Sequence, residues 1–301
     1  MHINTDAYQQ IAWNGTLITI PVSWEPHVAG VRHLIFEKDF QPLAEIRWED
    51  GSKYHERNFS TVLKKFKKQT AAKIYNGKPQ KQWLPFDKIF ETLCYTTTDG
   101  YTIDGGIWFC LKSKTLILFQ LFPAKSEKKL KILSCLNTLS FLDRKKETEW
   151  RIQDFSLVMP PSFTLSSYTF APGLTRLSFT APNLDVQICR LAPADNRLAT
   201  QSLNQILLTL AGLSKVPAEI IEENYSCKAQ RNPTIWQQIR LRLRREKPFV
   251  DARLWHDTSS NRLLAVVLSS RRPIPADLIE TLCQHYEIIQ NKTTETTTDQ
   301  T

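Results

Sequence analysis

The chain has 301 residues, of which 42% are apolar, and it carries a formal net charge of +9. This length suits two domains of ordinary size, and this apolar fraction excludes a disordered chain. No apolar run approaches the roughly 20 residues that a membrane-spanning helix needs, and the first ten residues lack the pattern of a signal peptide. We therefore expect a cytoplasmic protein with reduced cysteines, whose positive charge favours anionic partners or surfaces.

The first half of the chain predicts three short strands, a helix, three more strands and a second helix. The first strands are expected at residues 17–20, 31–36 and 44–48, from their apolar alternation. A lysine-rich helix follows at 60–74, with Ser60 as a plausible N-cap. Strands at 91–98, 101–111 and 115–122 precede a helix that begins at Ser126, and residues 143–149 form a charged linker.

The second half of the chain repeats this order about 140 residues later. Strands are expected at 155–159, 174–179 and 184–191, a helix at 200–212, strands at 236–245, 249–255 and 262–269, and a last helix from Pro275. The matched positions are Trp13 with Trp150, Ile20-Pro21 with Met159-Pro160, Phe36 with Phe179, Ile46 with Ile188, Trp108 with Trp255, and Cys135 with Cys283.

This pattern predicts two tandem copies of one domain. The copies are expected at residues 12–142 and 150–290, followed by a disordered tail at 291–301 that has no apolar anchor. Each copy reads β3-α-β3-α, and the short turns between successive strands favour a mainly antiparallel sheet. The expected class is therefore α+β, with two helices in each copy.

The order of elements resembles the PsbP/DcrB-like superfamily. The residues that carry the resemblance are ITIPVSW at 18–24, with its strand, proline and tryptophan, and Leu139-Ser140-Phe141 after the closing helix. The second copy departs from this pattern, with Phe163 in place of Trp24 and Ile288-Ile289 in place of Ser-Phe. Members of that superfamily are generally non-enzymatic binding subunits, adaptors and chaperones. The resemblance therefore implies partner binding and leaves the partner open.

Motifs for catalysis or metal binding are not found in the sequence. Nine glycines form no phosphate-binding loop, and there is no HExxH, GxSxG or paired-cysteine zinc pattern. The imidazoles of His27, His33 and His55 could converge on a metal, but ordinary surface histidines explain them as well. Cys283 and His285 are two apart on an expected helix and so point to different faces. We expect no catalytic, cofactor or metal residues.

One basic segment is a candidate for binding anions. In IRLRLRR at 239–245, a strand would place Arg240, Arg242 and Arg244 on one face, spaced about 7 Å apart, where they could track phosphates. Arg245 would extend the charge, and Trp236 and Trp255 could stack on bases. The alternative interpretation is a solvated outer face whose arginines pair with acidic neighbours.

These observations predict a non-enzymatic binding, adaptor or chaperone-like protein that presents a joint surface from its two repeats. The expected partner is a protein, for which an acidic surface is one option, and the chain is expected to act as a monomeric pseudo-dimer rather than a large oligomer. The alternative hypothesis is a nucleic-acid-binding protein that uses the arginine segment.

Overall fold

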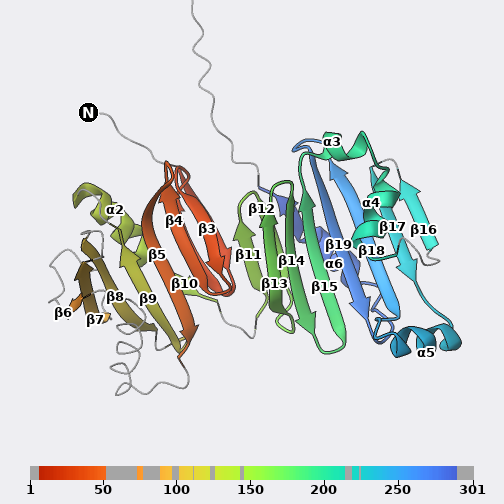
Figure 1. Ribbon diagram of the computed structural model, residues 1–301, viewed down its shortest axis with the longest axis horizontal. Coiled ribbons are helices and arrows are strands. Elements are labelled where there is room, and N and C mark those ends of the chain that lie inside the picture. Colours follow the sequence, from red (N-terminus) through yellow and green to blue (C-terminus); the bar gives the residue numbers. More distant parts are fainter. Residues whose placement is uncertain are drawn as a thin grey trace, which may run out of the picture. The chain divides into compact units, whose positions relative to one another are not determined.

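The computed structural model describes residues 7–51, 73–76, 89–96, 102–110, 112–122, 126–142, 146–213, 219–223 and 225–289. The chain divides into two compact units, Met1–Gln153 and Asp154–Thr301. Figure 1 shows the elements of both units, which are described separately below.

The first unit is built around a seven-stranded antiparallel sheet with the order β3-β4-β5-β9-β8-β7-β6. A second group of strands in this unit has the order β10-β2-β1-β11, and helix α2 packs against β2. The elements are β1 (Tyr8–Trp13), β2 (Thr16–Pro21), β3 (Glu25–Gly30), β4 (His33–Lys38), β5 (Gln41–Asp50), β6 (Lys73–Asn76), β7 (Ile89–Thr96), β8 (Thr102–Cys110), β9 (Thr115–Leu121), α2 (Ser126–Asn137), β10 (Ser140–Phe141) and β11 (Thr148–Ile152).

The second unit contains a seven-stranded antiparallel sheet with the matching order β13-β14-β15-β19-β18-β17-β16, and β12 pairs with β20 beside it. The elements are β12 (Phe155–Met159), β13 (Thr164–Ala171), β14 (Leu174–Ala181), β15 (Leu184–Leu191), α3 (Ala194–Leu198), α4 (Leu203–Leu210), β16 (Glu219–Glu223), β17 (Ser226–Arg231), α5 (Ile235–Leu243), β18 (Phe249–Asp257), β19 (Arg262–Ser270), α6 (Leu278–Gln284) and β20 (Tyr286–Ile288).

Local sequence explains the best-defined of these elements. Strands β12 and β15 have the bounds expected from their apolar residues. The hairpin β1–β2 turns at Asn14-Gly15, whose φ angles of 46° and 83° suit the Asn-Gly pair that a two-residue hairpin favours. Helix α4 begins at a capping box in which Ser202 and Gln205 exchange hydrogen bonds between side chain and backbone.

Alternation along β18 gives the second sheet two buried faces. Ala252 and Leu254 belong to a core that packs under α4. Residues of the other face meet α6, and Trp255 on this face makes an edge-to-face contact with Tyr286 at 5.6 Å. The sheet is therefore covered by helices on opposite sides, and α6 lies over β18 and β19.

The expected α+β class with two helices in each of two copies is wrong. In the part of the chain that the structure describes, strand accounts for 54% and helix for 17%. The described first unit contains α2 alone, whereas the second contains four helices, of which α3 and α5 were not predicted. Exposed edge strands such as β3 and β13 were also missed, because an edge strand without a fully buried face lacks clean alternation.

Two expectations fall partly on residues that the structure does not describe. The lysine-rich helix expected at 60–74 lies outside the described residues, except that Lys73 and Ile74 belong to strand β6. The expected tail at 291–301 also lies outside them. Strand β11 begins at Thr148, within the expected linker, and pairs with β1 of the first unit through Ala12 and Arg151.

Candidate functional site

The predicted arginine strand at 236–245 is a helix, α5. Thr234 precedes it, and the side chain of Gln237 accepts a hydrogen bond from the backbone N–H of Thr234 at 2.9 Å. This Thr-x-x-Gln spacing is the signal for a helix start that the sequence prediction overlooked. The apolar residues at 239, 241 and 243 led to the wrong prediction of a strand, because alternation over five positions fits a strand as well as a helix.

The helix separates the arginines that a strand would have aligned. Arg240 and Arg244, four residues apart, lie on one side, and Arg242 lies on the other. All three are exposed, and Arg242 Nη2 donates to the backbone oxygen of Arg271 at 3.0 Å. A row of guanidiniums spaced for successive phosphates is therefore not formed by these residues.

The two tryptophans of the predicted site are also far apart. Trp236 is exposed on α5, which follows the end of β17 near Arg231. Trp255 lies opposite Ser226 at the other end of β17, with its ring 5.6 Å from that of Tyr286. Since Arg231 pairs with Val250, the two ends are separated by five residues of β18, or about 17 Å. The six predicted residues do not form one site.

A cavity of about 600 Å³ lies near Trp255 in the second unit. Strands β17 and β18 form its floor, and the last turn of α6 forms a wall. Its lining residues are Tyr225, Ser226, Arg253, Trp255, His256, Cys283 and Gln284. The cavity therefore combines aromatic rings with a guanidinium, which is the composition of a pocket that holds an aromatic or acidic group.

A carboxylate on α6 fixes the cationic wall of this cavity. Glu280 accepts hydrogen bonds from Lys228 Nζ at 2.8 Å and from Arg253 Nη1 at 2.6 Å. The hydrogen bond from Lys228 and the charge of Arg253 lower the pKa of Glu280 despite partial burial. The trio carries one net positive charge, and the buried carboxyl of Asp251 interacts with both Lys228 and Glu280, so Arg253 is the cationic group that lines the cavity.

Cys283 carries a thiol that could be reactive and also lines the cavity. Its surroundings, however, make this thiol unreactive. Burial raises the pKa of the Cys283 thiol to about 12, against the weaker opposing effect of Arg253. A thiol that stays protonated at neutral pH is a poor nucleophile and a poor metal ligand. His285, which was weighed as its partner, instead contacts the backbone oxygen of Thr281 through Nδ1 at 2.9 Å.

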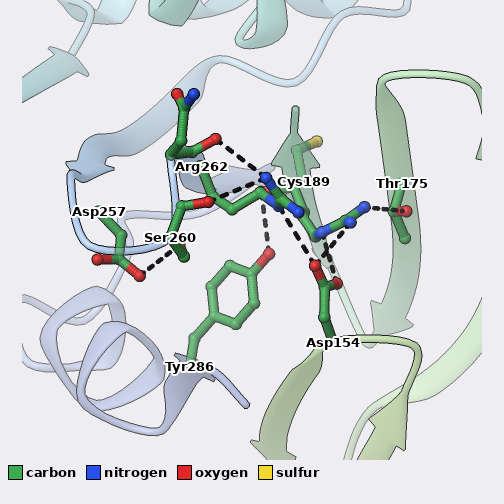
Figure 2. A network of polar contacts seen from close by, with 9 residues as sticks. Asp154, Thr175, Cys189, Asp257, Ser260, Arg262 and Tyr286 are labelled. Carbon is green, nitrogen blue, oxygen red and sulfur yellow. Dashed lines mark hydrogen bonds and ion pairs between the residues drawn. The ribbon is translucent and has the colours of Figure 1, made fainter. Parts of the chain in front are cut away.

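A second polar cluster lies where β12 begins, and Figure 2 shows it from close by. The carboxylate of Asp154 accepts a hydrogen bond from Arg190 Nη2 at 2.7 Å and another from Arg262 Nε at 3.3 Å. Arg190 also donates to Thr175, and the buried hydroxyl of Tyr286 donates to the backbone oxygen of Cys189 at 3.1 Å. Both guanidiniums are thus held by protein groups, so this cluster anchors β12 and β20 to the sheet.

Of the histidine trio considered for a metal, the structure describes His27 and His33. His33 lies 3.0 Å from Glu45, and burial is the largest cause that lowers the pKa of this imidazole. His27 lies on the neighbouring strand β3, and His55 falls outside the described residues. Among the residues that the structure places, no group of three or more His, Cys, Asp or Glu side chains could hold a metal ion.

Comparison with models of protein families found no match, and a search of curated proteins found no significant match. In the described part of the chain, no helix is both long and apolar enough to span a bilayer.

Proposed function

We propose that the protein is a non-enzymatic binding or adaptor protein, and that the cavity beside α6 holds a segment of a protein partner. The observation that carries the proposal is the cavity itself, which joins two aromatic rings, Tyr225 and Trp255, to the guanidinium of Arg253. A segment with an aromatic side chain next to an acidic one would match this composition.

The chemistry of the cavity favours binding over catalysis. Its thiol, Cys283, is held in the protonated form, and the carboxylate beside it, Glu280, is held in a double ion pair. His256 also lines the cavity and is a residue type suited to general acid–base catalysis, but the neighbouring thiol and carboxylate give it no activated partner, whereas recognition needs only fixed charge and rigid rings. Cys110, Cys135, Cys189, Cys227 and Cys283 are free thiols, which supports a location in the reducing cytoplasm.

Nucleic-acid binding stays as the second candidate. It depended on Arg240, Arg242 and Arg244 sharing one strand face, and α5 removes that geometry. The experiment below therefore includes a nuclease arm that separates the two candidates.

The test is a cross-link from the cavity combined with a variant that fills it. A photo-reactive phenylalanine at Tyr225, whose side chain is largely exposed, should form a covalent adduct with a protein partner in native lysate. A reactive group at Tyr8, a similarly exposed tyrosine of the first unit, serves as the control. Gln284→Glu should lower adduct yield about tenfold by placing in the cavity a negative charge that repels the acidic side chain of the partner.

His285→Glu adds the same negative charge to the next exposed residue, which does not line the cavity, and should leave the yield unchanged. Nuclease treatment should also leave it unchanged. An adduct that forms equally from position 8, or one that nuclease removes, would contradict the proposal. In the nuclease case, the second candidate would replace it.

A further inference from the structure

Helix α5 is an amphipathic helix whose apolar side faces solvent. Ile235 is 73% exposed, Trp236 81% and Leu243 81%, and no residue of the helix is buried. A surface helix normally turns its apolar stripe toward the core, where burial stabilises it. The half-buried residues of α5, Gln238 and Leu241, lie on the opposite side. The orientation is therefore inverted.

The exposed apolar residues form one continuous stripe. Positions 235, 239 and 243 follow one another at intervals of four, and Trp236 lies beside Ile235, so the stripe covers about 100° of the circumference. Ile239 is also exposed and lies in the middle of the stripe. Four large apolar side chains in one stripe exceed the scattered single residues that any protein surface shows.

Arginines border this stripe on both sides. On a helical wheel Arg242 lies next to Ile235, and Arg240 and Arg244 lie beyond Trp236. The segment 235–245 has four arginines and no acidic residue. Arg271 and Arg272 add two exposed cations at the same end of the sheet, where Arg242 contacts the backbone of Arg271. Figure 1 shows α5 at this end, beyond strands β17 and β18.

The end of α5 places one of these arginines in a strained conformation. Arg245 has φ of 60°, and Glu246 N–H donates to Leu241 O at 3.0 Å, which closes the helix in a Schellman turn. Helix α4 closes in the same way with Gly212, at φ of 67°. Glycine adopts this conformation without strain, so an arginine at this position lowers stability and adds a positive charge at the end of α5.

We propose that α5 is an interfacial helix that docks the second unit onto an anionic membrane surface. Its four apolar side chains would enter the boundary between headgroups and acyl chains, with Trp236 at the level that tryptophan favours. The arginines on either side would contact lipid phosphates, because their long side chains can extend from the apolar boundary to the headgroups. Such docking is reversible and crosses no bilayer.

Charge and shape together favour a membrane over the other anionic partners. A nucleic acid would use the arginines and leave the apolar stripe in water. A protein partner would need an apolar groove shaped to a protruding helix and lined with acidic groups. A bilayer offers apolar material directly beneath a layer of phosphates, and its fluidity accepts a ridge of any shape.

The test is cosedimentation of the full chain with vesicles of phosphatidylcholine alone or of phosphatidylcholine mixed with phosphatidylserine. We expect binding to the mixed vesicles that is at least about tenfold stronger than to the neutral ones and that weakens as salt rises. Trp236→Ser combined with Leu243→Ser should lower binding about tenfold. Leu130→Ser, on α2, is the control because it removes an exposed leucine from another helix.

A second readout places α5 itself in the interface. The fluorescence difference between the parent chain and Trp236→Phe, which keeps an aromatic ring, should shift to shorter wavelength when mixed vesicles are added. Arg240→Gln, Arg242→Gln and Arg244→Gln together should remove the preference for mixed vesicles while leaving the circular dichroism spectrum unchanged.

Absence of binding to mixed vesicles, or equal binding by the double serine variant, would overturn the proposal. Binding of the parent chain to polyglutamate or to RNA but not to vesicles would also overturn it, in favour of an acidic protein or a nucleic acid.

Discussion

Asp154 is the residue whose contacts hold the second unit together at its first strand. Its carboxylate lies between Arg190 and Arg262, and the three side chains are each less than one third exposed. Its backbone oxygen also accepts a hydrogen bond from Ile289 N–H at 2.7 Å. One residue thus ties the start of β12 to β15, to β19 and to the residue after β20.

Asp154→Asn should therefore destabilise the second unit by about 2 kcal/mol, because it leaves two guanidiniums without their counter-charge in a partly buried site. Urea unfolding followed by fluorescence measures the change. Asp277→Asn is the control, since the exposed Asp277 makes no side-chain cap hydrogen bond. Equal midpoints for the two variants would show that the cluster contributes little.

Two cysteines should react slowly in the folded chain. Burial raises the pKa of the Cys135 thiol to about 11 and that of Cys283 to about 12. Only the thiolate is alkylated, so at pH 8 both should react with iodoacetamide more slowly in the native chain than in urea. Mass spectrometry of the alkylated peptides gives the rates, and similar rates in the two states would contradict the prediction.

The same shifts affect stability at high pH. A thiol with a raised folded pKa stays neutral in the fold, while the unfolded thiol ionises near its ordinary value of 9.0. The unfolded state therefore loses a proton first, and stability should decline as pH rises from about 9 toward the folded values.

At the level of single elements, the contrast between α4 and α5 explains much of what the sequence could and could not predict. Helix α4 has its apolar residues on the inward side, with Ile206 and Leu207 buried, so the helical period was recognisable. Helix α5 has four of its five apolar residues outward, and their alternation with arginine resembles the pattern of a half-exposed strand. A local signal, Thr234 with Gln237, could have decided between the two.

The helix ends provide a matched pair of backbone variants. Arg245→Gly should raise stability by about 0.5–1 kcal/mol, because glycine adopts the left-handed conformation without strain. Gly212→Ala should lower it by about 1 kcal/mol, since the space around Gly212 is open and only the backbone conformation opposes a side chain. Thermal unfolding measures both. Changes of the same sign would show that contacts, rather than φ, control the outcome.

The candidate cavity could not be located from the sequence. Trp255 was identified as a candidate, but its expected companion Trp236 belongs to the other end of β17. The residues that do surround it come from β17, β18 and α6, and Cys283 is 28 positions away in sequence. Periodicity indicates which residues share a face of one element, whereas the cavity depends on how a helix packs across a sheet.

At the scale of the whole molecule, the two described units have the same order of strands in their seven-stranded sheets. This order cannot be predicted from the positions of the strands along the sequence. Each seven-stranded sheet has at its centre a pair of strands distant in sequence, β5 with β9 in the first unit and β15 with β19 in the second. Ala44 pairs with Leu121, and Leu184 pairs with Ser270. The sequence pointed to hairpins between neighbours, and the central pairing emerged only from the structure.

Such distant pairing should make folding slow. Pairing strands that are distant in sequence requires a long loop to close, and the entropy cost of closure comes before the stabilising contacts form. Sheets of this kind therefore refold in about milliseconds to seconds. Stopped-flow refolding from urea tests this, and a main phase in microseconds would contradict it.

Val266→Ala, in the centre of β19, should lower stability by about 1–2 kcal/mol, because its fully buried side chain packs in the sheet.

The position of β19 at the centre of its sheet also has a consequence during translation. Strands β13, β14 and β15 are complete once Leu191 has been added, but the strand that pairs with β15 ends at Ser270. At about 5–20 residues per second, the ribosome needs on the order of ten seconds to make the intervening segment. Throughout that interval one side of β15 has no strand to pair with, so this three-stranded segment of the nascent chain exposes an open edge that a chaperone could cover.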